Sequence, residues 1–205
     1  MIVIIGTGAV AAEITFFIKG FHLVKGYIEY PENIEKYYNK YHLKKPILGD
    51  IDSYEIKQGD EFMLGVADIP FRRKVINKIK SKGGKFINFI HPSSVVSPDF
   101  IQGEGNFISP FCMVDPNVKI GDFNLLTGYS ALSHDCTLGD NNILSSSILC
   151  GHVTAGSDNR FCIKSAVIPH ITIGNGTTIQ AGMTVDKDVP NNSTIFYRFK
   201  EKIII

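Results

Sequence analysis

The sequence predicts an α/β domain followed by an all-β domain, a parallel β-helix of hexapeptide repeats. Three observations carry this prediction. Strands alternate with helices over residues 1–91, aliphatic residues then recur every six positions, and small residues follow many of them four places later. A six-residue period is typical of a parallel β-helix, in which each repeat contributes one short, flat strand. An α-helical interpretation fails because the apolar positions do not recur at spacings of three and four.

The first 91 residues contain apolar β-branched runs separated by amphipathic stretches. We expect helices at 10–19 and 70–80, a loop with a short helix at 32–46, and strands at 2–5, 27–30, 61–66 and 86–90. Asp68 stands where it can cap the second helix, and Gly83 with Gly84 stands where it can end it. Strands alternating with helices imply a small parallel sheet covered by helices.

The hexapeptide period occupies the second half of the chain. It slips by one residue between Cys150 and Ala155, and only Gln102 clearly breaks it. Three repeats make one coil of about 18 residues, and successive coils stack about 4.8 Å apart. Each coil buries its anchors only against its neighbours, so several coils are needed for stability. The anchors are Val96, Ile108, Val114, Ile120, Leu126, Leu132, Leu138, Leu144 and Cys150, then Ala155, Phe161, Val167, Ile173, Ile179 and Val185.

Bulk composition narrows the class of function. The chain has 205 residues and a net charge of +1, so electrostatics do not favour binding to nucleic acid or membranes. The apolar run at 2–5 has no basic leader and ends at Gly6, which favours a buried strand over a signal peptide and predicts a cytoplasmic protein. The cysteines form no CxxC pair and three fall on inward positions, so we expect reduced core residues and no metal site. They are Cys112, Cys136, Cys150 and Cys162.

A glycine-containing loop follows the first expected strand. Gly6, Thr7 and Gly8 lie between that strand and the first helix. Glycines let the backbone approach an anion, and the helix N-terminus presents N–H groups and a positive dipole end. Glu29, at the end of the next strand, would then hold the ribose. The domain is too short for two mononucleotide halves, so a single nucleotide suits it better than NAD. A tight turn without a ligand is the alternative.

Several motifs together resemble the sugar O- or N-acyltransferases of the sialic-acid and bacillosamine type. The resemblance covers nearly the whole chain. It rests on the loop 6–8, on Arg72-Arg73-Lys74, on the junction at 90–96, and above all on the run 134–140, His-Asp-Cys-Thr-Leu-Gly-Asp. It implies a Rossmann-like nucleotide-sugar-binding domain (1–91), a left-handed β-helix acyltransferase domain (92–190) and a C-terminal tail (191–205). It further implies acetyl-CoA as co-substrate and a homotrimer with active sites between subunits.

The resemblance also implies the catalytic residues. His134 would be the general base that takes a proton from the sugar amine as it attacks the thioester, and Asp135 would support the imidazole. His134 follows anchor Leu132 by two places and is expected to point outward. A solvent-facing histidine beside a turn aspartate is the plainer alternative.

Cofactor and substrate contacts are implied more loosely. Gly151, Ile163 and Ala181 would border acetyl-CoA. Arg198 and Lys200 could reach its phosphates, with an ordinary solvated tail as the equal alternative. Thr127 occupies a place where the family often has Asn and would contact the sugar. The chain departs from the family pattern there, at Ala9-Val10 and in its C-terminal segment.

His152 stands 18 residues after His134, one coil further on. Before the slip is counted, the two side chains would stack about 4.8 Å apart. We therefore expect His152 to line the acyl-donor channel, with an exposed turn histidine as the alternative. The slip would move His170 to a different register, which argues against a metal site of three histidines.

The sequence thus predicts an acetyl-CoA-dependent N-acetyltransferase acting on a nucleotide-linked amino sugar of the 4-amino-4,6-dideoxy type, in surface-glycan synthesis. Two alternatives stay open. One is O-acetylation of a sugar of the sialic-acid type on the same scaffold, and the other is a non-catalytic binding protein that kept the fold.

Overall fold

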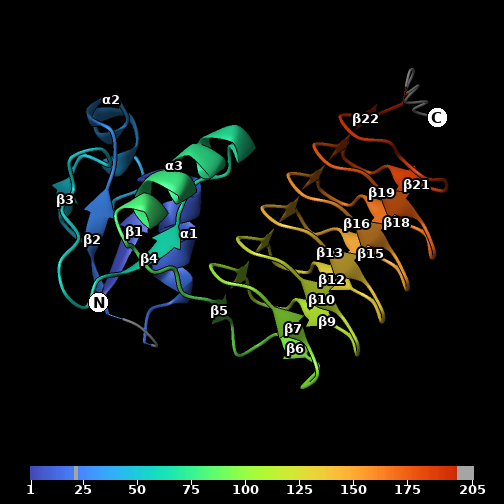
Figure 1. Ribbon diagram of the computed structural model, residues 1–205. Helices are drawn as coiled ribbons and strands as arrows, with labels where there is room; N and C mark the ends of the chain where they lie inside the picture. Colours follow the sequence, from blue (N-terminus) through green and yellow to red (C-terminus); the bar gives the residue numbers. More distant parts are fainter. Residues whose placement is uncertain (21–22, 198–205) are drawn as a thin grey trace, which may run out of the picture.

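The computed structural model describes residues 1–20 and 23–197, so the predicted cofactor contacts Arg198 and Lys200 lie outside the described residues. A layered α/β domain stands beside one end of a column of stacked coils (Figure 1). The two parts are joined through β5 (Phe89–Ile90), the first strand of the column.

The N-terminal domain has a four-stranded parallel sheet with the order β3-β2-β1-β4. Its helices are α1 (Ala9–Phe17), the short α2 (Pro31–Asn33), which continues into the π-helix η1 (Ile34–Tyr38), and α3 (Ile69–Ser81). Its strands are β1 (Ile2–Ile5), β2 (Val24–Ile28), β3 (Ile47–Gly49) and β4 (Glu61–Leu64). The prediction of a small domain with a parallel sheet and helices is confirmed.

Alternation along β1 explains the layering. Ile2 and Ile4 share a core with Ala11 and Ile14 of α1, whereas Val3 and Ile5 share a second core with the apolar side of α3. Successive side chains of a strand point to opposite faces, so a strand that is apolar throughout must be covered on both sides. One helix lies on each face of the sheet as a result.

The boundaries of α3 follow the predicted caps. Asp68 Oδ1 accepts a hydrogen bond from the Phe71 backbone N–H at 2.9 Å, and Gly83 after the helix has a φ of 81°. A left-handed residue just beyond a helix is the usual place for glycine. Both expectations are confirmed.

The sheet differs from the expectation in two ways. Strand β3 was not among the expected strands, and it pairs with β2 and forms the edge of the sheet. The run 86–90 was expected to be a fourth strand of this sheet. Instead, Phe86 makes one isolated bridge to Phe62, and Phe89 pairs with Phe107 in the β-helix, where their rings stack at 5.1 Å. Aromatic packing at the junction therefore assigns the end of this run to the second domain.

The β-helix has three faces, each a sheet of parallel two-residue strands. The first face holds β5, β8 (Phe107–Ile108), β11 (Leu125–Leu126), β14 (Ile143–Leu144), β17 (Arg160–Phe161), β20 (Thr178–Ile179) and β22 (Thr194–Ile195). The second holds β6 (Val95–Val96), β9 (Met113–Val114), β12 (Ala131–Leu132), β15 (Ile148–Leu149), β18 (Ala166–Val167) and β21 (Thr184–Val185). The third holds β7 (Ile101–Gln102), β10 (Lys119–Ile120), β13 (Thr137–Leu138), β16 (Thr154–Ala155) and β19 (Thr172–Ile173). This architecture fits the expected left-handed β-helix.

The one-residue slip lies earlier than the sequence suggested. Ala131 pairs with Ile148, 17 residues later, whereas Met113 pairs with Ala131 at the usual spacing of 18. Leu149, fully buried, is the anchor after Leu144, and Cys150 is only half-buried, so the assignment of Cys150 as an anchor was wrong. The turn at 145–147 is one residue shorter than the equivalent turns of the neighbouring coils. Ser147 there turns its hydroxyl inward, where it donates to the carbonyl of Phe161 at 3.0 Å.

The N-terminal domain packs against the first face. Outward side chains of that face, such as Leu125 and Ile143, are buried in the core that contains α1, whereas Met113 and Thr137 on the other two faces are exposed. Arg72 of α3 is buried across this junction. It donates from Nε to Asn141 Oδ1 at 2.7 Å and from a terminal nitrogen to the Phe123 carbonyl. Burial lowers the pKa of Arg72 to about 9, which leaves the guanidinium charged at neutral pH.

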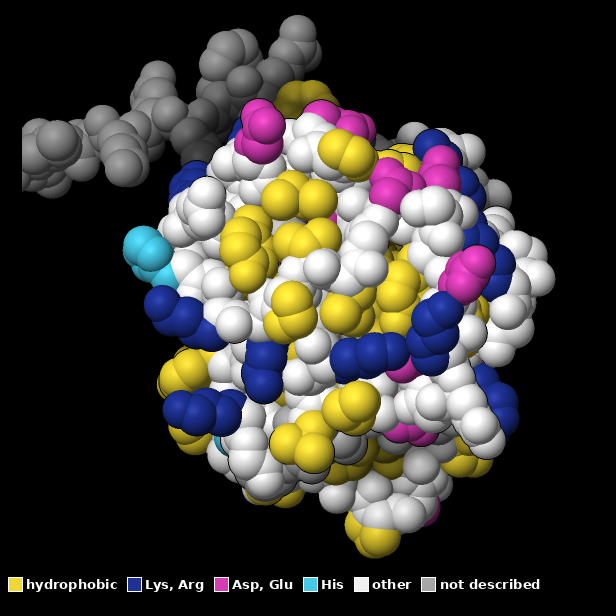
Figure 2. Space-filling view, turned by 90° about the vertical axis from the view of Figure 1, so that its left-hand side faces the viewer, with side chains coloured by type: hydrophobic (Ala, Val, Ile, Leu, Met, Phe, Trp, Pro, Cys, Tyr) yellow, Lys and Arg dark blue, Asp and Glu magenta, His cyan; other side chains and the backbone are white. Residues whose placement is uncertain are grey.

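The outer side of the N-terminal domain mixes apolar patches with basic and acidic side chains (Figure 2). This agrees with the balanced composition, because side chains of both charges occur on this face. Among the helices of the described residues, none is long and apolar enough to cross a membrane.

Candidate active site

The candidate site lies in the turns that join the second face to the third. Four successive turns of this kind each have one residue with a positive φ: Asn117 (61°), Asp135 (60°), His152 (62°) and His170 (66°). Asn and Asp tolerate this left-handed conformation better than most other residues. The four residues occupy equivalent places in successive coils, so their side chains emerge in one row along one corner of the prism.

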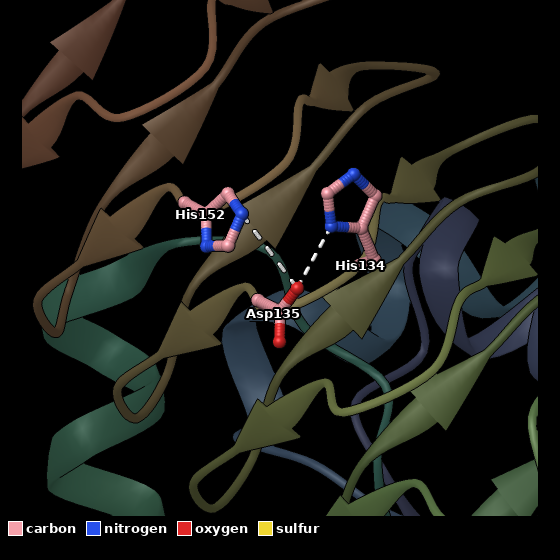
Figure 3. Close-up of side chains that lie close together, drawn as sticks. All are labelled: His134, Asp135 and His152. Carbon is pink, nitrogen blue, oxygen red and sulfur yellow. Dashed lines mark hydrogen bonds and ion pairs between the residues drawn. The ribbon is translucent and has the colours of Figure 1, made fainter.

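His134 and Asp135 form a hydrogen-bonded pair at this corner (Figure 3). The distance between His134 Nδ1 and Asp135 Oδ2 is 2.8 Å, and the side chains keep 56% and 36% of their exposure. The hydrogen bond with His134 is the largest cause that holds the pKa of Asp135 below its usual value. An ionised carboxylate on Nδ1 favours the tautomer with the proton there, which leaves Nε2 as the hydrogen-bond acceptor of the ring.

Asn117 fixes the other oxygen of the carboxylate. Its Nδ2 donates to Asp135 Oδ1 at 3.2 Å from the preceding coil. The sequence interpretation did not include Asn117, although it precedes Asp135 by one full coil and its register could have identified it. Asp135 is therefore oriented from one side by an amide and presents its second oxygen to His134.

Gly151 makes room for the imidazole. A Cβ atom at this position would lie 2.6 Å from Cε1 and 2.7 Å from Nε2 of His134. Because real Cβ contacts are longer than 3.0 Å, the His134 ring could not keep its place over any other residue. Gly151 was predicted as a cofactor contact. That prediction stays open. Independently of it, Gly151 provides the space that the His134 ring occupies.

His152 is equivalent in register to Asp135, not to His134. The slip precedes Leu149, so counting it moves His152 one place out of register with His134. The two rings still meet edge to face at 5.1 Å, and His152 Nε2 lies 3.7 Å from Asp135 Oδ2. As expected, the slip moves His170 out of register with His134, and its ring stacks instead on that of His152 at 4.6 Å and 8°.

The other predicted cofactor and substrate contacts lie elsewhere. Ile163, Ala181 and Thr127 belong to turns between the first and second faces, across the second face from His134. Ile163 and Ala181 are exposed. The Thr127 hydroxyl accepts a hydrogen bond from the Ser146 backbone N–H at 3.2 Å, so it supports the shortened turn. The predicted contacts therefore lie along two edges of the second face. Gly151 and His152 are at one edge, and Thr127, Ile163 and Ala181 are at the other.

The glycine loop lies at the carboxyl end of β1. Gly6 has a φ of 105°, and a Cβ there would lie 2.8 Å from the Gly65 carbonyl oxygen, so this turn requires glycine. Gly8 precedes α1 and lines a cavity of about 350 Å³ with Glu29, Asp68 and Phe71. The predicted nucleotide-binding residues Gly8 and Glu29 therefore share one cavity.

Glu29 is directed toward the loop. Its Oε2 accepts hydrogen bonds from the Thr7 backbone N–H at 3.0 Å and from the Thr7 hydroxyl at 3.2 Å. Its Oε1 accepts from the Tyr30 N–H at 2.8 Å and from Asn33 Nδ2 at 3.3 Å. Glu29 is 3% exposed. These contacts show that Glu29 shapes the loop, and the proposed ribose contact would have to be made in addition to them.

The cavity and the histidine row lie on opposite sides of the prism. The N-terminal domain packs on the first face through Arg72, Leu125 and Ile143, whereas His134 lies at the corner between the second and third faces. A molecule held in the cavity therefore faces away from His134 of its own chain.

No protein-family model and no curated protein matches the sequence. Solved structures do match. One is a histidine variant of perosamine N-acetyltransferase from Caulobacter crescentus in complex with CoA and GDP-perosamine. It is 25% identical, with a TM-score of 0.77 over 94% of this chain and 91% of the other.

Two further structures show the same fold at lower identity. The acetyltransferase domain of PglB from Neisseria gonorrhoeae is 20% identical, with a TM-score of 0.81 and 94% of each chain covered. WeeI from Acinetobacter baumannii is 19% identical, with a TM-score of 0.74 and 95% of each chain covered. The comparisons thereby confirm the resemblance that the motifs of this chain indicated, to the hexapeptide-repeat sugar O- or N-acyltransferases of the sialic-acid and bacillosamine type.

Proposed function

We propose that this chain transfers the acetyl group of acetyl-CoA to the amine of a nucleotide-linked amino sugar. The observation that carries the proposal is the His134–Asp135 pair, held at 2.8 Å at an exposed corner with the imidazole lying over Gly151. It is supported by the likeness over 94% of the chain to a sugar N-acetyltransferase solved with CoA and GDP-perosamine. A 4-amino-4,6-dideoxy sugar and a place in surface-glycan synthesis in the cytoplasm are the finer parts of the proposal.

The chemistry follows from the tautomer of His134. With the Nδ1 proton directed to Asp135, Nε2 accepts a proton from the sugar amine as its nitrogen bonds to the thioester carbon. The carbon–sulfur bond breaks, and the departing thiolate takes the proton back from the imidazolium. Asp135 stabilises the imidazolium while it exists. No covalent acyl-enzyme is needed.

The N-terminal domain would serve as a Rossmann-like nucleotide-sugar-binding domain and hold the nucleotide at Gly6, Thr7, Gly8 and Glu29. Because the nucleotide cavity and His134 of one chain lie on opposite sides of the prism, a sugar held by one chain would reach His134 of another. A homotrimer with sites between subunits meets this requirement. Acetyl-CoA would lie along the second face, near Gly151, His152, Ile163 and Ala181, with Thr127 near the sugar.

The activity is tested by thiol release from acetyl-CoA with UDP-, dTDP- and GDP-linked amino sugars, beside the His134→Ala variant. Turnover with one acceptor that is lost in the variant would support the proposal. Turnover only with hydroxyl acceptors of the sialic-acid type would replace it by O-acetylation. A folded protein that neither turns over nor binds acetyl-CoA would indicate a binding protein.

The shared site is tested by mixing two inactive variants, one altered at His134 and one in the loop at Gly8, where a side chain meets no other atom of the fold and enters the cavity. Subunits are exchanged by mild denaturation and refolding. Sites formed from the intact loop of one chain and the intact histidine of another would regain part of the activity. If light scattering finds a monomer, or if mixing restores nothing, the intersubunit site is wrong.

A further inference from the structure

We propose that His134, Asp135 and His152 form an inhibitory binding site for Zn²⁺ or a similar divalent transition-metal ion. One nitrogen from each histidine and one carboxylate oxygen lie within 4.8 Å of one another (Figure 3). All three side chains belong to turns on the same corner, and none is buried. The ion would be an inhibitor of the site and not a cofactor of the reaction.

The separations suit a tetrahedral ion. Zinc binds imidazole nitrogen and carboxylate oxygen at about 2.0–2.2 Å, so two ligand atoms on one zinc lie roughly 3.3–3.5 Å apart. Asp135 Oδ2 is 2.8 Å from His134 Nδ1 and 3.7 Å from His152 Nε2, values that bracket this range. A shift of a few tenths of an ångström in exposed side chains would bring these two pairs to the separation a metal requires.

The surroundings orient the ligand atoms. Asn117 holds Asp135 Oδ1 at 3.2 Å and so directs Oδ2 toward the two histidines. His170 stacks on the His152 ring at 4.6 Å and limits its rotation. Loss of such outer contacts typically weakens metal binding by about 10–100-fold. Asp99 adds a carboxylate two coils away on the same corner, where it accepts from the Asn117 backbone N–H at 2.9 Å.

The donor set selects the class of ion. Two imidazoles and one carboxylate suit Zn²⁺, Co²⁺ or Ni²⁺, whereas Mg²⁺ and Ca²⁺ prefer oxygen ligands throughout. Three protein ligands leave a fourth position open to water.

Binding would block the general base. The metal takes the place of the proton between His134 Nδ1 and Asp135, and the single proton of the neutral imidazole moves by way of solvent to Nε2. His134 bound through Nδ1 then carries its proton on Nε2, so it has no lone pair to accept the proton of the sugar amine. Occupation of this site and acetyl transfer therefore exclude each other.

The test begins with binding, because binding does not depend on the proposed function. The full-length protein is titrated with Co²⁺ and followed by visible absorption, and Zn²⁺ is then added to displace it. We expect one Co²⁺ per chain with a tetrahedral spectrum. His152→Asn keeps a residue that tolerates the left-handed turn and removes one imidazole, and should weaken binding by about tenfold or more. His170→Phe is the matched control, since it keeps the stacked ring and should leave affinity unchanged.

Absence of Co²⁺ binding at millimolar concentration, or equal binding by wild type and His152→Asn, would overturn the site. The inhibitory part rests on the proposed function and is measured separately. Zn²⁺ should stop acetyl transfer over the concentration range in which it displaces Co²⁺, and a chelator should restore it. Binding without inhibition in an active enzyme would reject the inhibitory role while leaving the metal site, and an inactive protein that binds Co²⁺ would count against the proposed function alone.

Discussion

Gly151 lies directly against the imidazole of His134. A Cβ atom on residue 151 would lie only 2.7 Å from His134 Nε2. The glycine stands in the coil after the histidine, and the slip in the repeat brings the two together. The reactive nitrogen of the proposed base therefore lies over glycine, the one residue type without a Cβ atom to collide with it.

Gly151→Ala should lower kcat by about 10²-fold, because the methyl group displaces a ring whose position must be correct to about 1 Å. The thermal midpoint should hardly change, since the His134 ring is exposed and can move aside, and residue 151 is not in the left-handed region. Steady-state kinetics and thermal melts check this. Unchanged kcat in the alanine variant would show that the ring position does not matter.

Asp135→Asn should lower kcat by roughly 10²-fold or more while the fold is kept. Asparagine tolerates the φ of 60° and can still accept from Asn117 Nδ2, but its own amide would face His134 Nδ1 and favour the wrong tautomer. The measurement is kcat with acetyl-CoA saturating. Asn117→Gly, which keeps the left-handed turn and removes the support of the carboxylate, should have a smaller effect, and a larger one would reverse the assigned roles.

Glu29→Gln should weaken binding of the nucleotide sugar by about tenfold and leave acetyl-CoA binding unchanged. Both carboxylate oxygens of Glu29 accept from donors, so an amide group places an N–H against another N–H on one side. Titration calorimetry with each substrate separates the two affinities. Glu32→Gln, an exposed change in the same segment, serves as the control. An equal loss of acetyl-CoA affinity would argue against a nucleotide site at this loop.

Arg72→Leu should destabilise the protein by about 3 kcal/mol, because it leaves buried acceptors at Asn141 and Phe123 without their donors. Arg73→Leu removes a half-exposed bidentate pair with Asp158 and should cost about 1 kcal/mol or less. Urea unfolding of both variants measures the difference. Equal midpoints would mean that Arg72 does not join the two domains.

Much of the fold could be predicted because short-range geometry determines it. The six-residue period specifies flat strands joined by turns, Asp68 caps the helix that follows it, and Gly6 occupies a turn that no other residue could adopt. The His134–Asp135 pair could also be predicted, because adjacent residues in one turn are brought together without any help from the rest of the chain.

Only the tertiary structure decided how the coils lie on one another. Leu149 and Cys150 are adjacent and both apolar, so the sequence did not show which one is the anchor, and packing selected the larger side chain for the core. That single choice places Gly151 over His134 and brings His152 to Asp135. Likewise, the pattern of the strand placed Glu29 beside the loop, but only the folded domain shows its carboxylate turned inward onto Thr7. Register between coils and the direction of a buried side chain depend on contacts between distant segments, and no local pattern contains that information.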